Sequence, residues 1–274
     1  MDARELTVTG CGILVAVFAG GCLVAGFGVL GIDGHRATYP VTDGDAGAAA
    51  VPAYNHGITL DVPLPASPAT VPYYRVVSVL QDSAENGIAP AVKAQIPSVE
   101  DAPELARKAL EPYGKLPFDA ILEKTGQVTM KKYNPFTGAV EKEFPQYTQV
   151  VYRQYVNGSP VINSKISVAL GESGELLDYS KDWYVLEQDG YVPVISAEEA
   201  REKLKKQDLL LRPQCCVDGY NITRVQSGYY ITVHSPYARD GKTADTCTPV
   251  WIFYGIKTGT GSDPFPLLVN ATRG

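Results

Sequence analysis

The sequence has few of the residues from which catalytic and metal sites are usually built. It contains three histidines and two methionines in 274 residues. The histidines, His35, His56 and His234, lie far apart in the chain. The patterns H-E-x-x-H, G-x-S-x-G and the phosphate-binding glycine loop are all absent. We therefore expect no catalytic residue, no cofactor and no metal site, and we predict that the protein is not an enzyme.

A surplus of basic residues is also missing. The chain carries 24 Lys and Arg against 30 Asp and Glu, which gives a formal net charge of -6 and a pI near 5.2. Proteins that bind nucleic acid neutralise phosphates with Lys and Arg. We therefore exclude nucleic acid as a partner. The 17 tyrosines and 20 prolines, by contrast, suit a chain rich in strands and loops.

Cysteine is sparse and unevenly placed, with five residues in all. Cys11 and Cys22 lie in an apolar run and are interpreted as small apolar residues. The other three are Cys215, Cys216 and Cys247. A disulfide between Cys247 and either of the other two would leave one thiol over, and we favour this bridge. Free buried thiols, or a metal site without a nearby fourth ligand, are the alternatives.

Charge is absent from the apolar run between Thr7 and Ile32. A bilayer core of about 30 Å needs about 20 apolar helical residues, and this run is long enough. We predict a transmembrane helix within residues 1–33 that contacts the membrane from about Val8 to Ile32. A cleaved signal peptide, whose apolar core would be shorter, and a buried core helix are the alternatives.

The orientation of this predicted anchor is not decided by its flanking charges, because Arg4 precedes it while His35 and Arg36 follow it. Three Asn-x-Ser/Thr glycosylation sequons favour a C-terminal part outside the cytoplasm. Their asparagines are Asn157, Asn221 and Asn270. We therefore predict a single-pass cell-membrane protein whose C-terminal head lies outside the cytoplasm, at a prokaryotic cell surface.

The segment after the predicted anchor is rich in proline, alanine and glycine from residue 34 to residue 72. Proline stiffens the chain and removes hydrogen-bond donors, so we interpret the segment as a stalk. The alternation from Ile58 to Val62 allows a strand packed on the head instead. The head begins near Tyr73 with a predicted strand from Tyr74 to Leu80.

A helix followed by strand-like runs occurs twice in the head. The first helix starts with Asp101, Pro103 and Glu104, and the second starts with Ser196 and Glu199; both starts resemble a capping box. Each helix carries an apolar stripe at helical spacing. The first stripe is Ala102, Leu105, Ala106, Ala109 and Leu110, and the second is Ala197, Ala200 and Leu204.

The strand-like runs alternate between apolar and polar residues and are separated by turn signals. Asn157-Gly158 is the preferred dipeptide of a type I′ hairpin, because both residues tolerate positive φ. We predict an α+β fold: an N-terminal transmembrane helix followed by two helix-on-antiparallel-sheet units, at residues 73–190 and 191–274. The aromatic residues of the second unit, such as Tyr229 and Trp251, are expected in the core.

Three passages resemble the PepSY and thermolysin-type propeptide superfamily. They are Val151–Ile162 with Ile166–Leu176, the helix start at Ser196, and Pro249–Tyr254 with Leu268–Gly274. The resemblance implies peptidase propeptides and inhibitors, or extracytoplasmic modules of membrane-anchored regulators. It implies tandem domains on an anchor here, and it supplies no catalytic residues to transfer.

From these observations we expect a membrane-anchored, extracytoplasmic regulatory module that binds a protein without catalysis. The expected partner is a peptidase, a sensor ectodomain or an envelope subunit. A structural subunit of a cell-envelope or surface complex is the first alternative, and a peptidase inhibitor acting in trans is the second. If some of the aromatic strands are exposed, one edge strand could accept an extended peptide by strand addition.

Overall fold

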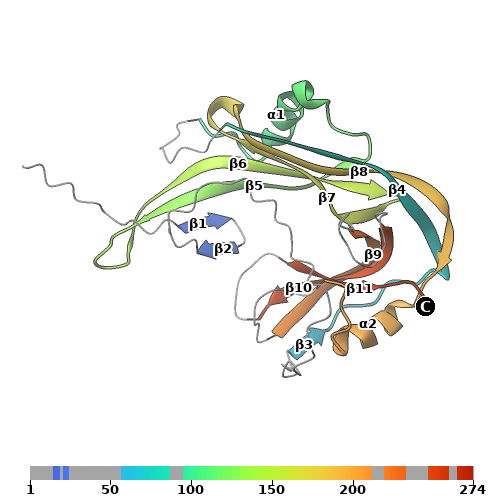
Figure 1. The fold of residues 1–274 in the computed structure, drawn as a ribbon. Coiled ribbons are helices and arrows are strands. Elements are labelled where there is room, and N and C mark those ends of the chain that lie inside the picture. Colours follow the sequence, from blue (N-terminus) through green and yellow to red (C-terminus); the bar gives the residue numbers. More distant parts are fainter. Residues whose placement is uncertain are drawn as a thin grey trace, which may run out of the picture.

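The computed structural model describes residues 15–18, 21–24, 57–86, 95–211, 219–232, 246–258 and 264–273. Strands dominate these ranges (Figure 1). The strands are β1 (Val15–Phe18), β2 (Gly21–Val24), β3 (Gly57–Leu60), β4 (Thr70–Glu85), β5 (Ala120–Tyr133), β6 (Val140–Val156), β7 (Ser159–Leu170), β8 (Leu176–Pro193), β9 (Gly219–Thr232), β10 (Thr246–Lys257) and β11 (Phe265–Asn270). The helices are α1 (Ala102–Ala109) and α2 (Ala197–Lys205), with short 3-10 turns at Glu111–Tyr113 and Glu172–Gly174.

All eleven strands belong to one hydrogen-bonded sheet in the order β2-β1-β5-β6-β7-β8-β4-β10-β9-β3, with β11 beside β10. Neighbours are antiparallel except where β3 runs parallel to β9. A further parallel contact, between Val161 of β7 and Tyr229 of β9, joins two strands that are distant in this order. Strands β7, β8, β4, β10 and β9 therefore close into a ring of five.

The closure between β7 and β9 relies on a side chain as well as on the backbone. The Asn163 side-chain amide donates to the Ile231 carbonyl (2.6 Å), and the Ile231 N–H donates to the Asn163 side-chain oxygen (3.0 Å). The strands also approach closely at Gly228, where an added Cβ would lie 2.8 Å from the Pro160 carbonyl oxygen. Glycine is required there because a larger residue would push β7 away from β9.

The interior of the ring is a small tyrosine-rich core to which all five strands contribute. Its buried members are Tyr74, Val161, Tyr184, Tyr229, Ile231 and Cys247. The rings of Tyr74 and Tyr229 meet edge to face, with centroids 5.2 Å apart. Both hydroxyls have partners: the Asn157 side chain donates to Tyr74 (2.6 Å), and Tyr229 donates to the Pro72 carbonyl (2.9 Å). This core is therefore packed and hydrogen-bonded.

Helix α1 covers one face of the long sheet (Figure 1). Its Ala102 and Ala106, together with Leu110 just after it, are buried as the apolar stripe predicts. They pack on buried residues of β6, β7 and β8, among them Tyr152 and Trp183. Tyr152 also donates from its hydroxyl to the Pro103 carbonyl (2.9 Å), which fixes the helix on the sheet.

Helix α2 covers a second core built on β9, β10 and β11. The predicted capping box is confirmed: the Glu199 N–H donates to the Ser196 hydroxyl (3.1 Å), and the Ser196 N–H donates to the Glu199 carboxylate (2.7 Å). The predicted stripe is buried. Trp251 of β10 lies under the start of α2 and donates from its indole nitrogen to the Ile195 carbonyl (3.0 Å).

The predicted α+β fold class is wrong. The helices hold only eight and nine residues, whereas β4, β6 and β8 run for 16, 17 and 18. Each helix does pack on strands, but the strands below them join into one sheet instead of two separate helix-on-sheet units. Strand β8 crosses the predicted boundary between the two units at residue 190. The strand that the Ile58–Val62 alternation allowed is present as β3.

The predicted transmembrane helix and single-pass membrane localisation are also overturned. Across the described ranges, no helix has both the length and the apolar character needed to cross a membrane. The described parts of the predicted span, residues 15–18 and 21–24, are strands β1 and β2, which pair with each other and with β5. The run between Thr7 and Ile32 contains seven glycines, and each weakens a helix by about 1 kcal/mol relative to alanine.

Candidate binding edge on strand β4

One edge of strand β4 is paired by described strands over only a small part of its length. Its first edge pairs with β8 from Thr70 to Glu85. In the described residues, its second edge pairs with β10 at Tyr74 and Arg75. Within the described part of the chain, no strand pairs with the second edge from Val76 to Glu85. We call the regular part of this stretch, Ser78–Glu85, the β4 edge.

The ladder beneath the β4 edge is regular, because Ser78–Glu85 pairs residue by residue with Val185–Asp178. Just beyond it, the Asn86 N–H donates to the Leu177 carbonyl (2.9 Å), so Asn86 points toward β8. Main-chain groups alternate in direction along an antiparallel strand. The N–H and C=O groups of the odd-numbered residues therefore point away from β8, namely Val79, Gln81, Ser83 and Glu85.

The outward amide of Ser83 has a local partner. The Ser83 N–H donates to the carboxylate of its neighbour Asp82 (2.9 Å). A carboxylate placed this way satisfies an edge amide that no strand covers, and charged residues on edges discourage unplanned pairing. The β4 edge therefore presents main-chain groups to an added strand. The exposed carboxylate of Asp82 discourages unplanned pairing there.

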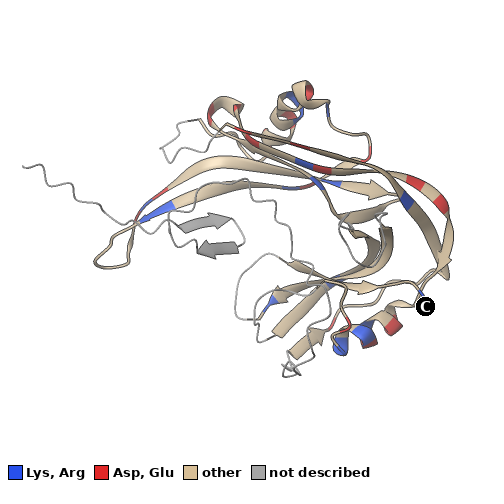
Figure 2. Ribbon diagram, in the orientation of Figure 1, with Lys and Arg blue, Asp and Glu red and all other residues tan. Residues whose placement is uncertain are grey.

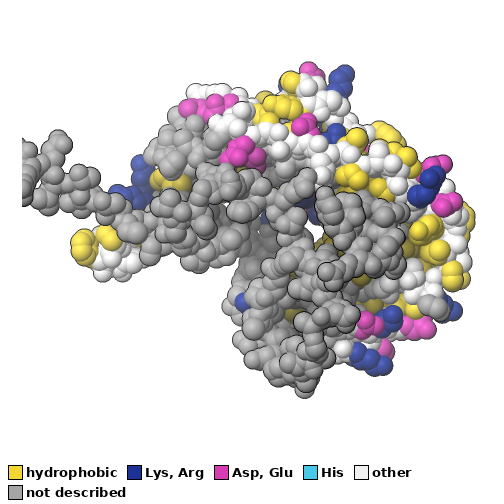
Figure 3. Space-filling view, viewed as in Figure 1, with side chains coloured by type: hydrophobic (Ala, Val, Ile, Leu, Met, Phe, Trp, Pro, Cys, Tyr) yellow, Lys and Arg dark blue, Asp and Glu magenta, His cyan; other side chains and the backbone are white. Residues whose placement is uncertain are grey.

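Apolar side chains are exposed beside the start of this edge. Val77, Val79 and Leu80 are 52%, 40% and 43% exposed, and Val185 of β8 is 42% exposed. Every residue from Val77 to Ser83 is exposed. Figure 3 shows hydrophobic side chains gathered at the upper right of the molecule, where Figure 1 places β4 and β8. Grouped exposed apolar residues are typical of interaction surfaces.

Acidic side chains lie at the other end of the edge. Glu85 and Asp178 stand directly opposite each other across the ladder, and like charges in that position repel. Burial raises the pKa of Asp178, and the charge of Glu85 adds to the increase. Asp182 accepts a hydrogen bond from the Gln81 side chain (3.0 Å) and lies opposite Lys165 of β7. Figure 2 shows the charged positions along β4 and β8.

Two other edges in the described ranges are less suited to pairing. Strand β5 is uncovered from Ala120 to Gln127, but a bulge at Glu123 interrupts it. Glu123 is also held by an ion pair with Arg153 (2.7 Å). The outer side of β11 is contacted by the segment before it, because the Leu210 N–H donates to the Leu268 carbonyl (2.8 Å). The β4 edge is therefore more regular than the β5 edge and less covered than the β11 edge within the described residues.

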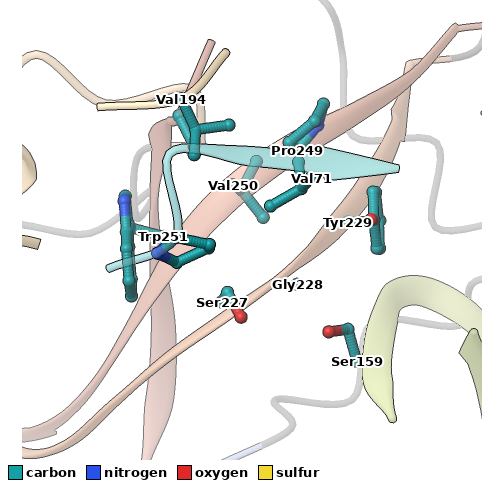
Figure 4. Close-up of a pocket in the computed structure, with 11 residues that line it drawn as sticks. Val71, Ser159, Val194, Ser227, Gly228, Tyr229, Pro249, Val250 and Trp251 are labelled. Carbon is teal, nitrogen blue, oxygen red and sulfur yellow. The ribbon is translucent and has the colours of Figure 1, made fainter. Parts of the chain in front are cut away.

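A small pocket lies between β4, β9 and β10 (Figure 4). Its wall is mostly apolar, with Val71, Val250 and Trp251, while Ser159 and Ser227 contribute hydroxyls. The enclosed space holds about one or two water molecules, far less than a substrate needs. No histidine or carboxylate lines it, so it holds no serine-activating base.

The residues of the predicted disulfide are only partly described. Cys247 in β10 is fully buried and is bonded to no described cysteine, and burial raises the pKa of its thiol to about 12. Cys215 and Cys216 lie outside the described residues, so the bridge stays a prediction. The thiolate, which is the reactive form, is negligible at pH 8 for such a group.

We expect iodoacetamide at pH 8 to leave Cys247 unmodified in the native protein and to modify it in urea. Mass spectrometry of the peptide that contains Cys247 measures this. Labelling in urea that requires prior reduction would establish the predicted bridge, and labelling in urea without reductant would exclude it. Fast labelling of the native protein would contradict the buried position of the thiol.

The three sequon asparagines lie in different settings. Asn157 begins the predicted hairpin turn, and the positive φ of Asn157 (48°) and Gly158 (76°) confirms that turn. Asn221 is exposed on β9. Asn270 accepts hydrogen bonds from the Thr272 N–H (2.9 Å) and hydroxyl (2.7 Å) within its own sequon. Glycosylation at these positions stays a prediction.

The remaining sequence candidates do not converge on a site. His35, His56 and His234 lie outside the described residues. The described ranges contain no group of His, Cys, Asp and Glu side chains that could hold a metal ion. Tyr229, Trp251 and Phe253 are buried, which confirms their predicted place in the core.

Sequence reasoning missed the β4 edge. It predicted a strand from Tyr74 to Leu80, whereas β4 continues through the polar residues Gln81 to Glu85. The overlooked signal was the exposed alternation Val77, Val79, Gln81 and Ser83, which continues the strand period into a polar stretch. Which strands lie beside an edge cannot be read from local sequence.

Comparison with known proteins gives no family. No protein-family model matches the chain, and no curated protein matches it. It is similar to an uncharacterized protein from Eubacterium rectale ATCC 33656, with a crystal structure at 1.45 Å resolution, at 17% identity and a TM-score of 0.33. The match covers 65% of this chain and 53% of that chain, so it spans about half of the other protein. The PepSY resemblance stays a prediction.

Proposed function

We propose that this protein is a non-catalytic binding module that receives an extended segment of a partner protein along the β4 edge. The observation that carries the proposal is the outward direction of the main-chain groups of Val79 and Glu85, on a regular strand that no described strand covers. An added strand would complete these hydrogen bonds, which is the basis of recognition by strand addition.

The surroundings of the edge support the same function. The exposed side chains of Val77, Val79 and Leu80 would be removed from water by an added strand. Burying apolar surface contributes about 25 cal/mol per Å². The hydrogen bonds then provide affinity for any extended backbone, while the flanking side chains select among sequences.

A proline at Val79 is the most direct test of this function. Proline removes an outward N–H and leaves the inward hydrogen bonds to β8 in place. We expect Val79→Pro to weaken binding at least tenfold on an array of ten-residue peptides, compared with the unchanged protein. Val79→Ala is the matched control, since it shortens the side chain and keeps the N–H, and we expect it to stay within about threefold.

Hydrogen exchange on the full chain gives an independent readout. In the free protein the amides of Val79 and Glu85 should exchange faster than those of Leu80 and Ala84, which face β8. A bound peptide should slow the first group. Slow exchange at Val79 and Glu85 without any peptide, or equal peptide binding by Val79→Pro, would overturn the proposed function.

A further inference from the structure

Polar side chains from four strands other than β4 lie around the hydroxyl of Tyr254 in β10. Gln226 of β9 donates to this hydroxyl from its side-chain amide (3.2 Å). Burial raises the pKa of Tyr254, and four titratable side chains lie near enough to shift it further. They are Arg224 of β9 and Arg153 of β6, which lower the pKa, and Glu123 of β5 and Tyr155 of β6, which raise it. We call these four side chains, together with Tyr254 and Gln226, the Tyr254 cluster.

The guanidinium of Arg224 is positioned by the ring of Tyr254. The two residues lie opposite each other on β9 and β10, and the guanidinium carbon lies 4.0 Å from the centre of the ring. The ring is itself held, because Tyr254 is half-buried and its hydroxyl accepts the Gln226 hydrogen bond. A cation over an aromatic face is attracted to it, so the Arg224 side chain loses less freedom when it binds a ligand.

Hydrogen-bond donors of the Tyr254 cluster are available to a ligand. Arg224 is exposed, and no carboxylate of the described residues lies within ion-pair distance of it. The hydroxyl of the half-buried Tyr155 has no hydrogen-bond partner among the described residues. The Tyr254 hydroxyl accepts from Gln226 and keeps its own proton to donate. The cluster therefore offers a guanidinium and two hydroxyl donors around one position.

The Tyr254 cluster is positively charged, whereas the whole chain has a net charge of -6. Glu123 is the carboxylate of the cluster, and it forms an ion pair with Arg153 (2.7 Å). Arg153 also donates to the Ile162 carbonyl, so it is bound on two sides. The charge of Glu123 is thus balanced by Arg153, and the charge of Arg224 remains uncompensated. This balance favours a ligand group with a single negative charge.

We propose that the Tyr254 cluster binds the carboxylate of a ligand. The Arg224 guanidinium presents paired N–H groups that match the two oxygens of a carboxylate, and a tyrosine hydroxyl adds a further donor. A phosphate dianion would bring a second negative charge near Glu123. The carboxylate belongs either to a small organic acid or to an acidic side chain of a polypeptide. This site does not rest on the proposed function, because it uses none of the residues of the β4 edge.

Thermal unfolding of the full chain tests the site, because a ligand that binds the folded state raises Tm. Sodium acetate, acetylated and amidated Gly-Glu-Gly, and inorganic phosphate each replace chloride at constant ionic strength and neutral pH. We expect acetate to raise Tm more than phosphate does, once the rise in Arg224→Gln is subtracted, since excluded ions stabilise any folded protein. A larger rise with the peptide than with acetate would assign the carboxylate to a polypeptide, and a smaller one to a small organic acid.

Three variants separate carboxylate binding from a general effect of charge. Arg224→Gln should lose the specific rise, while Arg107→Gln, an exposed position on α1 with the same change of net charge, should keep it. Arg224→Lys keeps the charge without the paired N–H groups, and we expect about fivefold weaker apparent acetate binding.

Equal rises in Arg224→Gln and Arg107→Gln would overturn the site. A rise that depends on Arg224 with phosphate but not with acetate would overturn the carboxylate as its ligand. Either result leaves strand addition on the β4 edge intact, because Val79→Pro tests that function separately.

Discussion

Replacing Trp251 with alanine is expected to lower the free energy of unfolding by about 3–5 kcal/mol. Trp251 is 2% exposed and is the largest side chain in the core beneath α2. Its removal would leave a cavity that the surrounding strands cannot fill. The Ile195 carbonyl would also lose the indole N–H that it accepts at 3.0 Å, next to the start of the helix.

Urea unfolding, followed by circular dichroism, measures this loss. Trp251→Phe is the matched variant, since it keeps most of the ring volume and removes the hydrogen bond, and we expect it to cost about 1–2 kcal/mol. A loss below about 1 kcal/mol for Trp251→Ala would contradict the packing of α2 on β10, because truncation of a buried aromatic residue costs more.

Replacing Asn163 with alanine is expected to lower the free energy of unfolding by about 2–4 kcal/mol. Its side chain bonds both the N–H and the C=O of Ile231, which is 1% exposed. Each buried main-chain group left without a partner costs about 1–3 kcal/mol. The variant would therefore weaken the closure of the five-strand ring at the junction of β7 and β9.

Gln149→Ala provides the comparison for Asn163→Ala. The Gln149 side chain donates only to the Ser167 hydroxyl (3.0 Å) in a half-buried position, so its loss leaves no main-chain group unpaired. We expect it to cost no more than about 1 kcal/mol. Equal losses from both variants would show that Asn163 does not hold the ring closed.

The local elements of this fold could be predicted where a short sequence fixes its own backbone. The Asn157-Gly158 turn and the Ser196–Glu199 capping box are satisfied by residues next to one another, and both are confirmed. The expected cap at Asp101 is different. There Ser98 bonds Asp101 in both directions, and the Asp101 side chain caps no helical amide.

The fold class could not be predicted because the apolar pattern does not specify which strands meet. A buried strand and a buried helix segment have the same composition over short runs, which is how Val15–Phe18 came to be assigned to a helix. The ring closes through one backbone pair and the side chain of Asn163, and neither leaves a periodic signal.

The candidate site could not be predicted from the sequence for a related reason. The idea of strand addition came from aromatic strands in the second half, but Trp251 and Phe253 are buried. The candidate edge belongs to β4, whose residues resemble those of any half-exposed strand. Which strands pair with this edge, such as β10 at Tyr74 and Arg75, is a property of the tertiary structure.

The pairing of β4 with β8 has a consequence for synthesis on the ribosome. Arg75 and Glu187, which form an ion pair across these strands, are 112 residues apart in the chain. Strand β4 therefore emerges long before its partner, and closing so long a loop is slow. During that interval both edges of β4 are uncovered, and the nascent chain is most exposed to aggregation. Asp82 and Glu85 already sit on β4 at that stage, and their charges oppose mispairing before β8 arrives.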